Sequence, residues 1–180
     1  MVKRAARPSL SDHYNDRVLA LRYIYVLALA IWLGGMIVLG AVVAPATFHV
    51  LQAAEPAHGR LLGGAVFGAV LSRFHYVAYG AGTLTFLALA AMALLGPRPR
   101  DFSARAFIVA LMLVIALYSG LAVLREINAI QQEVGALPSS LPAGDTRRVR
   151  FDELHQRSTH LMMLNIVGAL VLLYWEAREP

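Results

Sequence analysis

The sequence predicts an all-α integral membrane protein, a four-helix bundle whose N and C termini lie on the same side of the membrane. Of its 180 residues, 58% are hydrophobic and only 15% are charged, whereas a soluble domain carries roughly 25% charged residues. The mean hydropathy is +0.60. The charges are clustered, and they leave five charge-free stretches at 23–54, 61–72, 74–97, 106–124 and 158–175. All but the second approach or exceed the roughly 20 residues that cross a bilayer as a helix.

We expect a single transmembrane domain over residues 1–180. Its first span covers about 22–44, with Tyr23 and Tyr25 at one interface as an aromatic belt. Pro45 then kinks or ends the helix, because proline has no backbone N–H. Residues 59–72 are apolar but too short to cross the bilayer. We interpret them as a short amphipathic or interfacial segment, or as an extension of the next helix, with small residues for close packing.

Three more spans follow. The second covers about 74–95 and stops at a Gly-Pro hairpin, and the third covers about 105–124. Residues 135–150 are rich in Pro, Ser and Gly, which predicts a polar loop. The fourth span covers about 157–175. Its purely apolar part is short, so Arg157 to His160 must reach the membrane edge.

Lysine and arginine counts predict the orientation. The side that carries the termini has nine of these residues and the other side has seven. The basic N-terminal tail, with Lys3, Arg4 and Arg7, favours cytoplasmic termini. We therefore predict an integral protein of the bacterial inner membrane. The net charge of +5 lies beside apolar spans, which predicts contact with lipid headgroups and not with nucleic acid.

Histidines gather on the side opposite the termini, and four of them lie at span ends: His49, His75, His155 and His160. Neutral imidazole binds copper, zinc and haem iron, and bundles build such sites from facing helices. We predict a metal site from these four histidines, with copper or haem b as the candidate. For haem, His75 and His160 would be ligands, with Arg73 and Arg157 near the propionates. The alternative is that these side chains only make hydrogen bonds in the headgroup zone.

The interior of the spans is poor in reactive groups. Acidic and basic residues are absent from their centres, which argues against an ion-coupled transporter, and there is no cysteine and no catalytic triad, P-loop or dinucleotide motif. Asn165 lies within the fourth span, where we expect its amide to bond to another helix. These observations favour a protein that is not an enzyme.

Three short motifs resemble those of a known family: Trp-Leu-Gly-Gly at 32–35, Pro-Ala-Thr-Phe at 45–48 and Phe-Asp-Glu-Leu-His-Gln-Arg-Ser at 151–158. The family contains small four-helix membrane proteins of unknown function and is similar to eukaryotic transmembrane protein 205. The likeness covers about 19–175 and implies a four-helix membrane bundle. More distantly, the first motif resembles the copper resistance protein D family. Four-helix protoporphyrinogen oxidases, which bind haem through histidine, are a related comparison, although the first span here contains no histidine.

Two functions follow from these observations. The first is a non-enzymatic inner-membrane protein whose outer-face histidines coordinate copper or haem b. The alternative is a cofactor-free accessory or scaffold subunit of a larger membrane complex, because Leu- and Val-rich faces dock other helices as well as lipid. The oligomeric state does not follow from the sequence.

Overall fold

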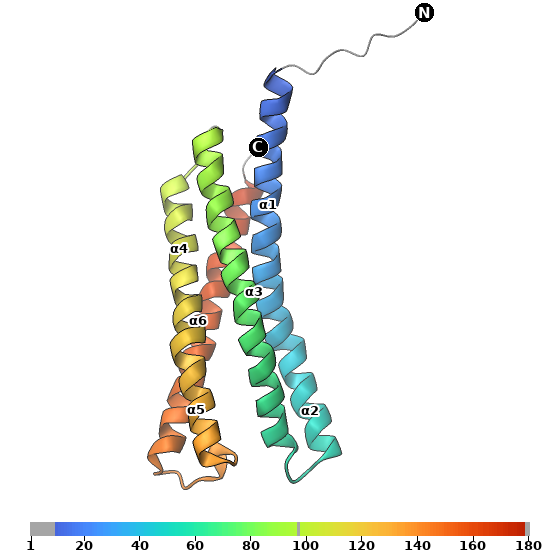
Figure 1. Cartoon of the computed structure of the whole chain (residues 1–180), viewed down its shortest axis with the longest axis vertical. Helices are drawn as coiled ribbons and strands as arrows, with labels where there is room; N and C mark the ends of the chain where they lie inside the picture. Colours follow the sequence, from blue (N-terminus) through green and yellow to red (C-terminus); the bar gives the residue numbers. More distant parts are fainter. Residues whose placement is uncertain (1–9, 97, 179–180) are drawn as a thin grey trace, which may run out of the picture.

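A computed structural model describes residues 10–96 and 98–178. Lys3, Arg4 and Arg7, which entered the orientation argument, lie outside these ranges. The described chain is helical and contains no strand, and four of its helices are long and apolar enough to cross a membrane. The all-α fold class is therefore confirmed, and the chain is an integral membrane protein. The beginning of α1 and the end of α6 lie at the same end of the bundle (Figure 1).

The described chain has nine helical elements, of which eight form the four long rods and one, η3, lies in the connection before α6. The first rod and the second contain α1 (Leu10–Val38), the π-helical segment η1 (Leu39–Val43), α2 (Ala44–Ala54) and α3 (Gly59–Leu95). The third and fourth contain α4 (Phe102–Tyr118), the π-helical segment η2 (Ser119–Val123), α5 (Leu124–Val134) and α6 (Thr146–Ala177), with the short 3₁₀ turn η3 (Pro138–Ser140) before α6.

Two helices are longer than the sequence patterns indicated. Residues 59–72, for which an interfacial segment and an extension of the next helix were both considered, are the first turns of α3, and no proline separates them from the second span. The fourth helix begins at Thr146 and not near 157. The Asp145 side chain accepts a hydrogen bond from the backbone N–H of Arg147 at 2.9 Å and so caps α6. The connection before it is therefore shorter than the predicted loop at 135–150.

Pro45 neither ends the first rod nor leaves it regular. A proline inside an α-helix removes one N–H and crowds the carbonyl four residues earlier. Here the turn before it widens into η1, in which the Ala44 N–H bonds to the Leu39 carbonyl. The widened turn accommodates the missing N–H of the proline, and the helix continues as α2. In Figure 1, α2 departs from the direction of α1 at this point.

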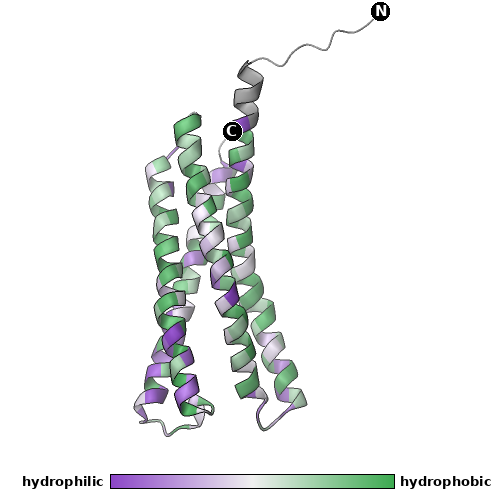
Figure 2. Cartoon of the chain, viewed as in Figure 1, coloured by the Kyte–Doolittle hydropathy of each residue, from purple (hydrophilic) through white to green (hydrophobic). Residues whose placement is uncertain are grey.

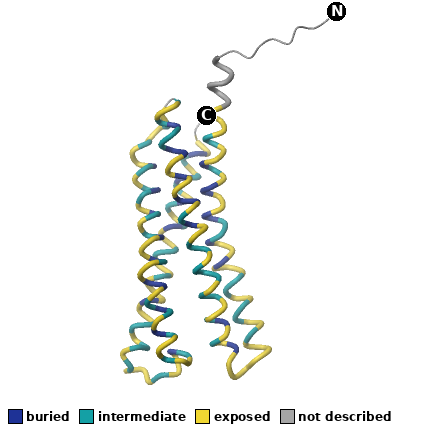
Figure 3. Tube along the Cα trace, viewed as in Figure 1, coloured by how far each residue is buried: buried dark blue, intermediate teal, exposed yellow. Residues whose placement is uncertain are grey.

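One half of the bundle is tightly packed, and we call it the ion-pair half. Its core is formed by aromatic, aliphatic and small residues of α1, α3, α4 and α6, among them Tyr25, Leu29, Leu89, Val109 and Leu172, each of which has no exposed surface. Figure 3 shows the buried residues along the inward faces of these helices. All four rods meet here, and the packing defines their relative positions.

An ionic triad with two buried members gives this half its name. Glu176 of α6 accepts hydrogen bonds from Arg22 of α1 and, at 2.8 Å, from Nη1 of Arg105 of α4. The Arg105 side chain is 2% exposed and that of Glu176 is 8% exposed. Two cations from different helices therefore share one carboxylate, which ties α1, α4 and α6 together where both ends of the chain enter the bundle.

The helices exceed the thickness of a membrane. With 37 residues and a rise of 1.5 Å per residue, α3 is about 55 Å long, whereas the hydrocarbon layer is about 30 Å thick. We call the opposite half, with the connections after α2 and α5, the loop half. Figure 2 shows that α5 and the first turns of α6 are polar there, whereas α2 and the facing part of α3 are largely apolar.

Candidate functional site

In the loop half the four rods separate into two pairs. In the first pair, α2 packs tightly on α3: a Cβ added to Gly63 would lie 2.7 Å from the Phe48 ring. In the second pair, α5 packs on α6 through a small core around Ile127, Ile130 and Leu154. The two pairs barely touch each other, and Figure 1 shows them diverging.

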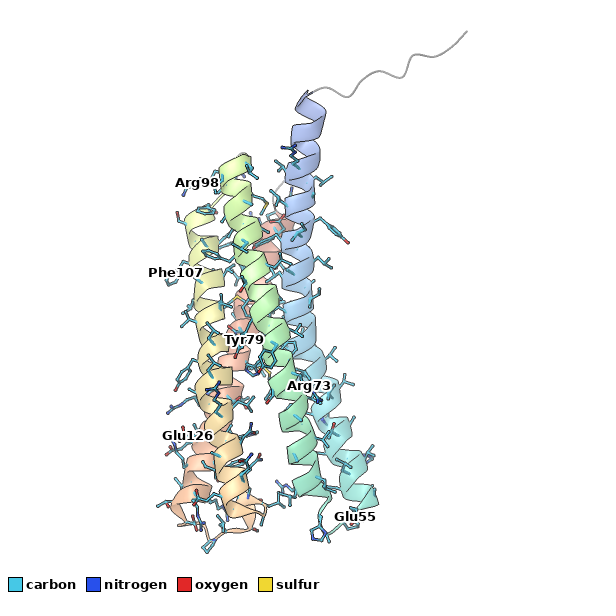
Figure 4. The ribbon with its side chains drawn as sticks, viewed as in Figure 1. Glu55, Arg73, Tyr79, Arg98, Phe107 and Glu126 are labelled. Atoms are coloured by element: carbon cyan, nitrogen blue, oxygen red, sulfur yellow. The ribbon has the colours of Figure 1, made fainter. Side chains whose placement is uncertain are left out.

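The second pair is also held by charge. The guanidinium of Arg150 on α6 donates two hydrogen bonds to the Glu126 carboxylate on α5, at 2.7 and 3.1 Å. Figure 4 labels Glu126 on α5 in the loop half. Parallel hydrogen bonds of this kind fix geometry as well as adding energy. The α5–α6 pair is thus a unit of its own, separate from the α2–α3 pair.

A cavity of about 690 Å³ lies between the two pairs. Its size falls within the range of roughly 300–1,000 Å³ that is typical of small-molecule sites. It is lined from Trp32 and Asn165, in the middle of the bundle, to Arg60 and Ser139 beside the loop-half connections. From Asp152 to Asn165, both of which line it, α6 rises about 20 Å. The site is therefore long, and it runs parallel to the helices.

The two π-helical segments border this cavity. Leu39 of η1 and Ser119 of η2 both line it. A π-helical turn inserts an extra residue and redirects the helix, and such turns are frequent at functional sites. The first rod changes direction at η1 (Figure 1). Both π-helical turns therefore lie where the cavity begins.

Close packing on the other side of η2 keeps that turn in place. A Cβ added to Gly120 would lie 2.1 Å from the Tyr79 hydroxyl oxygen and 2.5 Å from Cδ2 of His75, both on α3. Tyr79 is labelled in Figure 4. Only glycine permits this approach of α3 to η2. The contact closes the bundle just beside the cavity.

Polarity changes along the cavity in a defined order. The part next to the loop-half connections carries one cation and one anion, Arg60 and Asp152, and uncharged polar groups. In the middle, the α2–α3 side is apolar, with Phe48, Phe67 and Leu71, whereas the α5–α6 side also carries the polar residues Asn128, Ser158 and Thr159. The inner part ends at a set that includes polar side chains of α3, η2 and α6, namely His75, Ser119 and Asn165. The cavity is thus amphipathic, with polar groups at both ends.

The predicted histidine site is only partly brought together. His75 and His155 line the cavity, and His155 is also exposed to the surface; His49 and His160 are exposed and do not line it. His75 Nδ1 donates to the Leu71 carbonyl at 2.9 Å, which leaves Nε2 as the atom that accepts a proton or binds a ligand. His155 stacks on the Phe151 ring.

The predicted arginines also lie outside the cavity. Arg73 is exposed, and Arg157 is exposed and donates to the Tyr118 hydroxyl at 3.2 Å. Among the residues that the structure describes, no three His, Asp or Glu side chains gather where they could share a metal ion. Of the residues assigned to haem, only His75 therefore lies in the cavity.

Asn165 is a buried polar residue that lines the inner end of the cavity. It is 4% exposed, and its Oδ1 has no hydrogen-bond partner within the described ranges. The expected bond to another helix is therefore not made by this oxygen. The sequence shows a lone amide in an apolar span, but it does not show that the amide borders a cavity. Arg60 and Asp152 were likewise missed, because nothing local distinguishes them from other interface charges.

Four long apolar rods with a cavity between two of their pairs define the class: a polytopic helical membrane protein. The particular family follows from comparison. A family described as a domain of unknown function, DUF4149, matches residues 27–136, and the chain belongs to this family. This match fits the expected uncharacterised membrane family, but it gives no support for similarity to transmembrane protein 205 or to copper resistance protein D. No curated protein and no solved structure matched the chain.

Proposed function

We propose that the protein binds a single-chain amphipathic lipid in the cavity between its two helix pairs. The observation that carries the proposal is the cavity itself, which is large enough for a small molecule and is apolar on the α2–α3 side of its middle. The chain of the lipid would lie along Phe48, Phe67 and Leu71. Its head group would lie beside Arg60, which can donate hydrogen bonds to carboxylate or phosphate oxygens.

The position of the cavity supports a ligand that comes from the membrane. The rods are longer than the hydrocarbon layer is thick, so the polar turns of α5 and α6 belong to the headgroup region. A lipid held there keeps its head at the interface and its chain inside the bundle. If the termini are cytoplasmic, as the Lys and Arg distribution favours, the head lies at the outer face of a bacterial inner membrane.

A matched pair of glycine variants tests the proposal. A Cβ at Gly68, in the cavity wall, would lie 3.6 Å from the Asn128 side chain, which is an ordinary contact. Gly68→Leu therefore keeps the backbone and fills the cavity. A Cβ at Gly80, on the same helix but outside the cavity, would have no neighbour within 4 Å, so Gly80→Leu is the control with the same gain in helix propensity.

The readout is photo-crosslinking of a diazirine-bearing hexadecanoic acid to the protein in phosphatidylcholine nanodiscs. We expect labelling of cavity residues in the wild type and in Gly80→Leu, and loss of this labelling in Gly68→Leu. Equal labelling of the three proteins, or labelling confined to outward-facing residues, would contradict the proposal.

A second candidate is the binding of haem b or copper, and it is favoured by the presence of His75 and His155 in one cavity. The Leu71 carbonyl holds the His75 ring, an arrangement that orients many metal-binding histidines. Haem would supply redox or ligand-binding chemistry when bound. The visible spectrum of the purified protein, oxidised and then reduced with dithionite, tests haem: a Soret band that is lost in His75→Ala supports it, and a featureless spectrum removes it. Copper content measured on the same samples tests the metal.

A further inference from the structure

The inner end of the cavity has polar side chains that the methyl end of an unmodified fatty chain could not hydrogen-bond. Asn165 lies there, is almost fully buried, and has an Oδ1 without a hydrogen-bond partner in the described part of the chain. A buried polar atom left without a partner costs about 1–3 kcal/mol. Asn165 borders the cavity, and a half-turn of its amide exchanges the positions of its oxygen and nitrogen, so a polar group of a ligand there can bond to it.

Two further polar groups border the same inner end. Ser119, in η2, is 9% exposed. His75 lines the cavity and bonds to Leu71 through Nδ1, so its Nε2 is an acceptor when the ring is neutral. An amide and an imidazole with acceptor atoms, and a hydroxyl that can donate or accept, therefore face the space beyond the middle of the cavity.

We infer that the ligand carries a hydroxyl group at the far end of its apolar chain, so that it is polar at both ends. This inference rests on the proposed function, because it assigns the ligand of the same cavity. A hydroxyl both donates and accepts, so it satisfies Asn165 whichever way the amide is turned. The head group lies about 20 Å away in the direction of α6, at the end of the cavity where Arg60 can donate to it. The ligand class is thus an ω-hydroxylated fatty acid or a close analogue.

The chemistry of the wall favours this class over an unmodified chain. A methyl group at the inner end would leave the Asn165 amide without a partner, and a site built for hydrogen bonding rejects such an analogue. A bound water would satisfy the amide only if the chain stopped short of it. The choice between a hydroxyl of the ligand and a water is therefore open to direct measurement.

The test compares hexadecanoic acid with its ω-hydroxylated counterpart as competitors of the photo-probe in phosphatidylcholine nanodiscs. We expect the hydroxylated acid to compete about tenfold better in the wild type, the ratio that one buried hydrogen bond provides. In Asn165→Leu, which is similar in size but apolar, the two acids should compete equally. Thr83→Val removes an exposed hydroxyl outside the cavity and should keep the preference.

The outcomes separate this inference from the proposed function. If both acids displace the probe equally from the wild type, the inner end binds water or nothing, and the hydroxyl is overturned while the lipid site stands. If neither acid displaces the probe, the proposed function fails with it. Since the preference is a ratio of two affinities for one protein, partial misfolding of the Asn165 variant does not change it.

Discussion

The two halves of the bundle contain the same four rods but pack them differently. In the ion-pair half, all four rods share one core, and the carboxylate of Glu176 joins α1, α4 and α6. In the loop half, the rods separate into an α2–α3 pair and an α5–α6 pair with a cavity between them. The π-helical segments η1 and η2 line the cavity at the boundary between the two halves.

The comparison shows how a small membrane protein can be both stable and open. Apolar contact alone does not drive helices together in lipid, so close packing and polar contacts must do it. The ion-pair half has both, and it holds the rods in register. The loop half therefore does not need close packing between its two pairs, and a cavity with polar groups at both ends remains there. We assign stability to the first half, and the proposed lipid site lies in the second.

The largest effect should come from the ionic triad. Glu176→Gln removes the carboxylate that accepts a hydrogen bond from the guanidinium of Arg105, whose side chain is 2% exposed. Removing one partner of a buried ion pair costs about 3–5 kcal/mol. The free energy of unfolding, measured in mixed micelles with increasing dodecyl sulfate, should fall by about this amount. Glu153→Gln, in an exposed pair with Arg150, is the control and should cost less than about 1 kcal/mol.

A comparable cost for the two glutamate variants would contradict the assignment of stability to the ion-pair half. It would mean that the triad is open to water, where ion pairs contribute little.

Two glycine-to-alanine variants, one at the junction between the halves and one away from it, should change the stability of the protein in opposite directions. Gly120→Ala places a methyl group 2.1 Å from the Tyr79 hydroxyl oxygen, and overpacking of this kind costs about 1–3 kcal/mol. Gly80→Ala meets no neighbour and should stabilise the helix by up to about 1 kcal/mol. Thermal unfolding in detergent measures both variants. Stabilisation by both would show that α3 and η2 are not in close contact.

The α5–α6 pair should be held only weakly by its charges. Arg150 and Glu126 are each more than 40% exposed, so their pair should contribute about 0.2–1 kcal/mol. A double-mutant cycle with Glu126→Gln and Arg150→Gln measures this coupling energy. A coupling above about 2 kcal/mol would place the pair in a less polar environment than the headgroup region.

The smallest effect should appear at the start of α6. Hydrogen bonds from the Arg147 side chain, and then from its backbone N–H, lower the pKa of Asp145 from 3.8 to about 2. A lowered pKa in the folded state means that this contribution to stability is complete above pH 3.8 and is lost as the pH falls towards 2. The carboxyl carbon shift of Asp145, assigned with Asp145→Asn, measures the titration by NMR. A midpoint near 4 would show that the cap is absent.

Much of the fold could be predicted from the sequence, because a bilayer imposes strong rules on composition. The charge-free stretches predicted four spans, and Gly96 and Gly135 mark real helix ends. The sequence left open whether residues 59–72 continue into the second span. An apolar composition suits both a segment that contacts lipid and a helix that packs on another helix. The start of α6 was missed because its first turns are polar, and their partners lie on α5.

The candidate site could be predicted only in fragments. Histidines at the span ends drew attention to His75 and His155, which do line the cavity, but equally to His49 and His160, which do not. Those four differ in the direction of their side chains, and this depends on helix rotation. Two π-helical turns border the cavity, and only the turn before Pro45 has a local cause in the sequence.

The most direct test of the central claim uses the absence of cysteine from the chain. Ser158→Cys places a single thiol in the cavity wall, and Ser103→Cys places one at an exposed site outside it. We predict that hexadecanoic acid slows the reaction of a water-soluble maleimide with the first thiol and leaves the second unchanged. Equal reaction rates at Ser158→Cys with and without the acid would contradict a lipid site between the two helix pairs.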